Sequence, residues 1–293
     1  MKIAIYGQYH KPDDKVYIEE LLQALRIHEI EFVIENNYYL GLKKHFKDLK
    51  AETFSSHTEL DATFNFMFTI GGDGTILRAV TFIRDSNIPI VGINTGRLGF
   101  LATVKKEEIS TAVEQLLKKN YLIHKRTLLS VTTTPKIDGL ASLNFALNEV
   151  SISRKNTASM ITIETYLNQE YLTSYWADGL IISTPTGSTG YSLSCGGPIL
   201  IPQAKSFVLT PIAPHNLNAR PLVIPDETNI KLMVSGREDK FFLSLDSRIT
   251  TINSKTEVYI EKSNFNLKIV EINQQTFIKT LRDKLLWGQD VRN

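Results

Sequence analysis

The sequence predicts a two-domain protein, with an α/β N-terminal domain in which helices flank a parallel sheet, followed by an all-β, sandwich-like domain. Three observations lead to this prediction. In the first third of the chain, short apolar runs alternate with segments of helical periodicity. From Tyr121 onward, short alternating runs rich in β-branched and aromatic residues take over. Helical spacing then returns near the end of the chain, at Phe277, Leu281 and Leu285.

Length and composition are consistent with this division. The chain has 293 residues, of which 42% are hydrophobic and 22% charged. These fractions are near globular averages, so a sizeable core can be buried. We place the α/β domain at residues 1–122 and expect 273–293 to pack back on it. The β-rich domain then occupies residues 123–272.

The charge balance argues against a general nucleic-acid-binding protein. Lys and Arg number 33 against 31 Asp and Glu, whereas such proteins carry a basic excess. The one cysteine, Cys195, excludes an internal disulfide and a Cys-rich metal site, and fits a reducing compartment. The sequence shows no signal-peptide core and no apolar run of membrane-spanning length. We therefore expect a cytoplasmic protein that binds neither nucleic acid nor membrane.

Each domain has its own pattern of elements. In the first, buried apolar runs predict strands and three- and four-residue apolar spacing predicts helices. We expect strands at 3–6, 64–70 and 88–93, and helices around 18–25, over 75–84 and over 105–119. In the second domain, candidate strands are 128–134, 143–153, 160–167, 180–184, 207–212, 230–234, 241–245 and 257–261.

A glycine-rich loop, Gly71 to Thr75, follows a predicted strand and opens a predicted helix. Free N–H groups at a helix start attract phosphate, and glycines let the backbone approach its oxygens closely. The loop is not a dinucleotide fingerprint, since Leu77 stands where a third glycine would be, nor a Walker A loop. One alternative is a tight turn with Asp73 as the N-cap. A carboxylate repels phosphate unless it holds a metal or accepts a proton, so Asp73 favours a reaction centre.

A second loop, Thr184 to Ser194, is dominated by hydroxyl side chains and glycines. Such a segment can hydrogen-bond sugar hydroxyls and base edges, and Tyr191 offers a ring for stacking. The alternative is a solvated turn that is rich in Ser and Thr. Asn148 and Glu149 follow the apolar run 143–147, where a polar pair either faces a pocket or lies at an edge.

Two other residues are assigned structural roles. His215 lies in a proline-containing stretch, and we favour a hydrogen-bonded, structural role for it. Cys195 precedes two glycines, but nothing near it in the sequence supplies a base, and small buried thiols are common. Neither residue is expected to carry chemistry.

Taken in chain order, these motifs resemble the NAD kinase family. The residues that carry the resemblance are Gly71–Thr75, Asn148-Glu149, Asp178-Gly179 and Thr184–Ser192, with further likeness at 92–101 and around His215. The resemblance implies transfer of the ATP γ-phosphoryl group to the 2′-hydroxyl of the adenosine ribose of NAD. It also implies a divalent metal ion such as Mg²⁺, with ligands left unassigned, and a homo-oligomer, commonly a tetramer.

The resemblance also implies roles for single residues. Asp73 would accept the proton of the hydroxyl group. The residues implied to contact ATP or NAD are Gly71, Gly72, Gly74, Thr75, Arg78, Asn148, Glu149, Asp178, Thr186, Ser188, Thr189, Gly190, Tyr191, Ser192, Ser194 and Asp246. Some positions depart from the family pattern. Gly190 stands where many members have Ala, Asn216 and Asn218 replace commoner serines, and Arg248 replaces a commoner Gln, which raises the question of an altered phosphoryl-donor or NADH preference.

Two rival functions stay open at this point. A related lipid or other small-molecule kinase would share the Gly71–Thr75 loop, but an acyl substrate calls for an apolar groove or an interfacial helix, and neither is evident. A non-catalytic NAD(P) sensor would explain the binding loops. A pure binder gains nothing from Asp73 beside phosphates, so the kinase is favoured.

Overall fold

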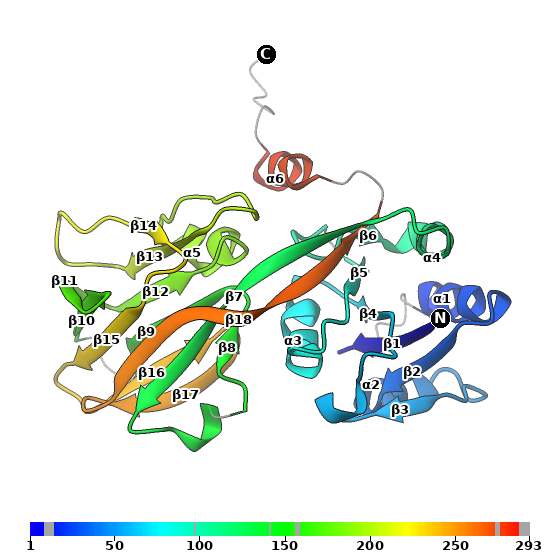
Figure 1. Cartoon of the computed structure of the whole chain (residues 1–293), viewed down its shortest axis with the longest axis horizontal. Helices are drawn as coiled ribbons and strands as arrows, with labels where there is room; N and C mark the ends of the chain where they lie inside the picture. The colour runs from blue at the N-terminus through cyan, green and yellow to red at the C-terminus, as the bar shows by residue number, and fades with distance from the viewer. Residues whose placement is uncertain (9–14, 97, 141, 156–158, 273–275, 287–293) are drawn as a thin grey trace, which may run out of the picture. The chain divides into compact units, whose positions relative to one another are not determined.

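The computed structural model describes residues 1–8, 15–96, 98–140, 142–155, 159–272 and 276–286 (Figure 1). The chain forms two compact units: residues 1–125 with those from Leu267 onward, and Arg126–Asn266. The expected boundaries, 122/123 and 272/273, lie a few residues from these. The difference arises because β7 (Leu122–Thr134) and β18 (Glu257–Glu271) each contribute residues to both units.

The first unit contains a parallel sheet in the order β3-β2-β1-β4-β5. Its strands are β1 (Lys2–Gly7), β2 (Glu31–Glu35), β3 (Glu52–Phe54), β4 (Phe66–Ile70) and β5 (Ile90–Asn94), and β5 also pairs in parallel with β6 (Val104–Lys105). Ile90 of β5 pairs in parallel with Ile269 of β18. Every residue of β4 and β5 is buried, which is why these strands appear in the sequence as continuous apolar runs.

Helices cover both faces of this parallel sheet. On one face, α1 (Lys15–Ile27) and α4 (Ile109–Leu117) share a core with alternate residues of β1. On the other, α3 (Asp73–Ile83) packs on the sheet, and its Phe82 ring lies 5.3 Å from that of Tyr6. The unit also contains α2 (Asn36–Lys43), α6 (Phe277–Leu285) and the 3₁₀ turns η2 (His57–Glu59) and η3 (Lys106–Glu108). The expected α/β architecture is confirmed.

The second unit is built of antiparallel strands around one apolar core. One sheet has the order β14-β13-β12-β9-β16-β17, and further pairing joins β11-β10-β15-β18 and β7-β8 (Figure 1). The bounds are β8 (Phe145–Ala146), β9 (Glu149–Arg154), β10 (Ile161–Leu167), β11 (Glu170–Ala177), β12 (Gly179–Ser183), β13 (Ser206–Ile212), β14 (Leu222–Pro225), β15 (Ile230–Ser235), β16 (Lys240–Leu245) and β17 (Arg248–Asn253). The expected β-rich architecture is confirmed.

Several elements were not expected from the sequence. In the first unit these are β2, α2 and β3; α2 buries only Tyr38 and Leu42, so its periodic signal is short. In the second they are β11, β14 and β17, whose residues are largely exposed and therefore show little apolar alternation. The expected strand 143–153 divides into β8 and β9, and β18 continues ten residues beyond the expected end at 261.

Both glycine-containing loops follow buried strands. The loop after β4 leads into α3, and the loop after β12 leads through the 3₁₀ turn η5 (Gly187–Thr189) into the short helix α5 (Tyr191–Ser194). A further 3₁₀ turn, η4, spans Asp138–Leu140. Within the described residues, no helix is long and apolar enough to cross a membrane.

Candidate functional site

The loop before α3 exposes its backbone at the start of the helix. Among the residues that the structure describes, nothing lies within 4 Å of a Cβ atom added to Gly72 or Gly74, so both positions are open to these residues. Gly71 has φ +146°, and a Cβ there would lie 2.3 Å from Thr75 Oγ1, so glycine is required at this position. The N-cap of α3 is Gly72, which has no side chain to cap the helix. The N-terminal N–H groups of α3 are thus reachable by an anion.

Asp73, the first residue of α3, directs its carboxylate to another loop of the same unit. Oδ2 accepts a hydrogen bond from Phe100 N at 2.7 Å, and Oδ1 accepts from Leu101 N and Ala102 N, both at 3.0 Å. A Cβ at Gly99 would lie 1.9 Å from Asp73 Oδ1. The alternative that Asp73 caps its own helix is therefore wrong, because its oxygens bond the segment 100–102.

Arg78 lies one turn further along α3, on an exposed position. In the amide orientation that satisfies both groups, the Gln8 oxygen accepts from Arg78 Nε at 2.7 Å and from Nη1 at 2.9 Å. Arg78 also lowers the pKa of Tyr6, but burial and Glu35 outweigh it and raise that pKa to about 12. A guanidinium thus lies on the helix that follows the glycine loop.

In the second unit, several hydroxyls of the 184–194 loop are used by the protein itself. Thr184 Oγ1 donates to Leu147 O at 2.6 Å, and Ser188 Oγ donates to Pro185 O at 2.7 Å. Ser192 Oγ lies 2.8 Å from Thr210 Oγ1. These three serine and threonine side chains are buried, so the alternative of a solvated turn is wrong for this part of the loop. The hydroxyls that remain accessible come from Thr186, Thr189 and Ser194, beside the exposed ring of Tyr191.

Asn148 and Glu149 lie at the start of β9, against the 184–190 loop. Thr184 N donates to Asn148 O at 2.9 Å, and a Cβ on Gly187 would lie 2.1 Å from the same oxygen. Among the described residues, Asn148 Oδ1 and Glu149 Oε2 are buried without a hydrogen-bond partner. Burial, and next the charge of Asp246, raises the pKa of Glu149 to about 7, although the Tyr191 N–H opposes the shift.

Asp178 and Asp246 are both held by other groups of the second unit. Asp178 Oδ2 lies 3.1 Å from Arg154 Nη2, and the side chain is partly exposed. The Asp246 carboxylate accepts from the N–H groups of Leu147 at 2.9 Å, Asn148 at 2.8 Å and Glu149 at 3.2 Å. Burial raises the pKa of Asp246 even though these bonds and Arg248 oppose the shift. Asp246 therefore bonds protein backbone.

The structure thus groups the predicted residues unit by unit. In the first, Gly71, Gly72, Asp73, Gly74, Thr75 and Arg78 occupy one loop and the helix that it opens. In the second, Asn148 and Glu149 lie beside Gly190, where a Cβ would be 3.3 Å from Glu149 Oε2. The sequence did not reveal the partners of Asp73 at residues 100–102, because backbone N–H groups leave no residue-type signal. His215 is exposed, and its ring packs 4.3 Å from that of Trp176.

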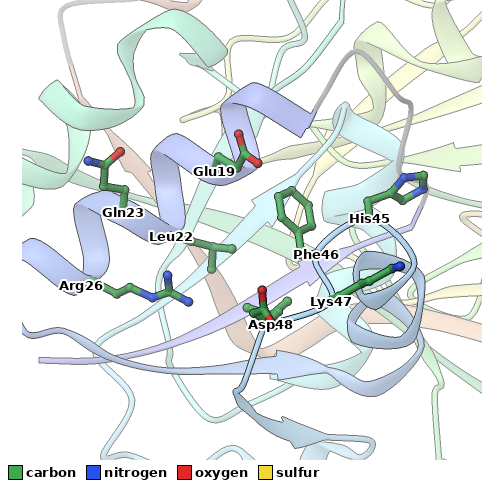
Figure 2. Close-up of a pocket in the computed structure, with 9 residues that line it drawn as sticks. Glu19, Leu22, Gln23, Arg26, His45, Phe46, Lys47 and Asp48 are labelled. Atoms are coloured by element: carbon green, nitrogen blue, oxygen red, sulfur yellow. The ribbon is translucent and has the colours of Figure 1, made fainter.

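A cavity of about 530 Å³ lies elsewhere in the first unit (Figure 2). It is formed by one side of α1, including Glu19 and Arg26, and by residues 45–49, among which Phe46 points toward the helix. None of the predicted site residues lines it. The cavity is therefore separate from the glycine loop and from Asp73.

Comparison with known proteins identifies the family. A model described as the ATP-NAD kinase N-terminal domain matches residues 11–121, and one described as the ATP-NAD kinase C-terminal domain matches 147–272. The chain is 55% identical to an NAD kinase of Flavobacterium johnsoniae and 45% identical to one of Cytophaga hutchinsonii, in each case over 100% of both chains.

Solved structures show the same fold. Yeast NADH kinase complexed with NADH superposes with a TM-score of 0.86 at 21% identity, covering 100% of this chain and 89% of that one. An NAD kinase from Archaeoglobus fulgidus in complex with ATP gives a TM-score of 0.77 at 25% identity, with 98% and 99% covered. The family models and relatives together span both units, and this chain belongs to the NAD kinase family.

Proposed function

We propose that this protein transfers the γ-phosphoryl group of ATP to the 2′-hydroxyl of the adenosine ribose of NAD, producing NADP. The observation that carries the proposal is the loop before α3, in a chain of this family. Gly72 and Gly74 leave the backbone open at the helix N-terminus, where N–H groups and the helix dipole stabilise phosphate oxygens. Arg78 adds a positive charge on the same helix.

Asp73 is the proposed proton acceptor. A carboxylate offers about four lone-pair sites, and three N–H groups, from Phe100, Leu101 and Ala102, bond to it. One site is thus left for the hydroxyl group. Phosphoryl transfer passes through a loose transition state that requires mainly alignment and charge stabilisation. A rigidly held, weakly basic aspartate suits this reaction, because it can orient the hydroxyl and accept its proton late.

The second unit supplies the proposed contacts with NAD. The buried oxygens of Asn148 and Glu149 that lack partners would accept hydrogen bonds from ribose hydroxyls, since leaving them unpaired costs free energy. Tyr191, 46% exposed, would stack on a base. Thr186, Thr189, Ser194 and Asp178 are proposed as further contacts. Ser188, Ser192 and Asp246 are proposed to act by shaping the loop and strand, because their side chains bond the protein.

A divalent metal ion fits this site only if the phosphates of the substrate supply most of its ligands. The described residues contain no group of three or more His, Cys, Asp or Glu side chains that could hold a metal. Mg²⁺ in kinases is bound mainly by substrate phosphates and water with one or two carboxylates. When bound, it would neutralise phosphate charge, and we assign no protein step to it.

We further propose a cytoplasmic homo-oligomer, a tetramer, which light scattering on the purified protein would test.

The test of the proposal is direct. The purified protein is incubated with ATP, Mg²⁺ and NAD, and NADP is measured with an NADP-specific dehydrogenase. Formation of NADP is expected, and its absence would reject the function.

Asp73→Asn should then lower kcat by roughly 10²- to 10⁴-fold, the range for a positioned acid or base, with little change in NAD affinity. An Asn variant with unchanged kcat would remove Asp73 from the chemistry.

A further inference from the structure

The turn between β16 and β17 holds the segment that precedes β9. It consists of Asp246 and Ser247, because Leu245 pairs with Arg248 across the two strands. Asp246 has φ 53°, a left-handed conformation that aspartate tolerates better than most residues. Its own N–H donates to Glu149 O at 2.9 Å. Together with the three N–H groups that its carboxylate accepts, Asp246 bonds residues 147–149 through four hydrogen bonds.

Arg248 holds the same segment a few residues earlier. Its Nη1 donates to Leu143 O at 2.6 Å and its Nη2 donates to Phe145 O. Its guanidinium also lies over the Phe145 ring, 5.2 Å from the centroid, and Nη2 lies 3.8 Å from Asp246 Oδ2. One planar cation therefore contacts two carbonyls, a ring and a carboxylate. Neither a shorter neutral Gln nor a single-point Lys ammonium can reproduce all of these contacts.

We propose that Asp246 and Arg248 are positioning residues for NAD binding, which fix the backbone of residues 143–149 so that Asn148 and Glu149 hold their oxygens ready for the dinucleotide. This inference rests on the proposed contact of Asn148 and Glu149 with NAD. The positions of the Asn148 and Glu149 side chains depend on the backbone of the segment that carries them. One end of the segment is bonded to Arg248, the first residue of β17, and the other to Asp246 in the β16–β17 turn, so these two residues determine its direction.

Arg248 contributes a positively charged guanidinium at this position. Removing the guanidinium should leave Leu143 O and Phe145 O without their donors and Asp246 Oδ2 without its nearby cation. The segment then gains freedom, and binding must order it again. The cost should fall on NAD, because Asn148 and Glu149 lie in this segment, and not on ATP, whose proposed loop lies in the first unit.

The experiment compares Arg248→Gln and Arg248→Lys with Arg237→Gln, a matched control in the exposed turn between β15 and β16. Calorimetry measures the Kd for NAD, and steady-state kinetics measure kcat and the KM for ATP. Loss of charged hydrogen bonds predicts that Arg248→Gln raises the Kd for NAD about tenfold. The KM for ATP of Arg248→Gln should equal that of the wild type, and Arg237→Gln should match the wild type in both constants. Arg248→Lys should recover part of the lost NAD affinity.

Several results would overturn the inference. One is an unchanged Kd for NAD in Arg248→Gln, whether or not the melting temperature falls, since a merely structural role predicts only a lower melting temperature. Another is an equal increase in the Kd for NAD and the KM for ATP. If Arg248→Gln does not fold, a wild-type Kd in Arg248→Lys would overturn it equally. A wild-type protein that makes no NADP would instead reject the proposed function, so the two failures are distinguishable.

Discussion

Glu149 is a carboxyl group whose surroundings favour its neutral form. Burial and the nearby Asp246 raise its pKa from 4.5 to about 7, so the folded protein binds this proton more tightly than the unfolded chain does. Linkage then fixes the sign of the pH effect. The contribution of Glu149 to stability is fully present below pH 4.5 and is lost as the pH rises to about 7.

We therefore predict that Glu149→Gln stabilises the protein more at pH 8 than at pH 5. One pKa unit corresponds to about 1.36 kcal/mol, so the difference between the two pH values should approach roughly 3 kcal/mol in the free energy of unfolding. Urea denaturation at both pH values measures it, with Glu170→Gln, at an exposed position of β11, as the control. Equal effects of the two substitutions would show that the Glu149 carboxyl is not perturbed.

Gly187 and Gly190 allow a second test at the scale of single residues. A Cβ at Gly187 would lie 2.1 Å from Asn148 O, a backbone atom that cannot move aside cheaply. A Cβ at Gly190 would lie 3.2 Å from Gly187 O and 3.3 Å from the end of the Glu149 side chain, so a small shift accommodates it. An alanine at this position is therefore sterically accommodated.

We predict that Gly187→Ala destabilises the protein by roughly 1–3 kcal/mol, the cost of overpacking, whereas Gly190→Ala changes stability by less than about 1 kcal/mol. Thermal melting of the two variants measures the difference. NADP formation should survive in Gly190→Ala and fall sharply in Gly187→Ala. Equal loss in both variants would mean that the loop tolerates neither methyl group.

At the scale of elements, α6 supports the loop that binds Asp73. The Phe277 ring lies 5.8 Å from that of Phe100, and Lys284 Nζ lies 5.0 Å from the centroid of the Phe100 ring. Phe100 in turn donates its N–H to Asp73 Oδ2. The helix near the end of the chain thus reaches the proposed catalytic carboxylate through one aromatic residue.

We predict that Phe277→Ala lowers kcat, because Phe100 loses its aromatic neighbour and the 100–102 segment holds Asp73 less firmly. A two- to tenfold decrease is expected, about 0.5–1.5 kcal/mol for the lost ring pair. Ile278→Ala is the control, since Ile278 lies on the same helix and is 61% exposed. Steady-state kinetics measure both variants. If their kcat values agree, α6 does not support the Asp73 loop.

The elements also show which features a sequence can reveal. Helical periodicity was visible in α3 and continuous apolar runs were visible in the central strands β4 and β5, so the architecture of each unit and the glycine loop before α3 could be predicted. The edge strands β11 and β14 bury few residues and left no such signal. The role of Asp246 was equally hidden. Its partners are backbone N–H groups almost a hundred residues away, and only the tertiary structure brings them together.

At the scale of the whole molecule, the two units differ in how the chain encodes them. Every residue of the apolar core of the second unit lies between 126 and 266. The core of the first unit includes Val270 and Ile272, next to the N-terminal strands and helices. The second unit is therefore continuous in sequence, whereas the first requires residues from both sides of it.

We predict that a fragment of residues 126–266 folds alone, because its core is complete. A fragment of residues 1–125 should not, because Val270, Ile272 and α6 are missing from its core and loop. Circular dichroism during heating measures both. A cooperative transition is expected only for the fragment 126–266. A cooperative transition in the fragment 1–125 would show that the β18 segment and α6 are dispensable for the first unit.

This arrangement also orders the events of biosynthesis. The ribosome releases β1 to β5 first, then the whole second unit, and only afterwards Ile269 of β18, which pairs with Ile90 of β5. At translation rates of about 5–20 residues per second, the edge of β5 waits on the order of ten seconds for its partner. During that interval only the short strand β6 pairs with this edge of β5, at Ile93 and Asn94, and the core lacks Val270 and Ile272. The first unit is therefore the part that a ribosome-bound chaperone would have to protect.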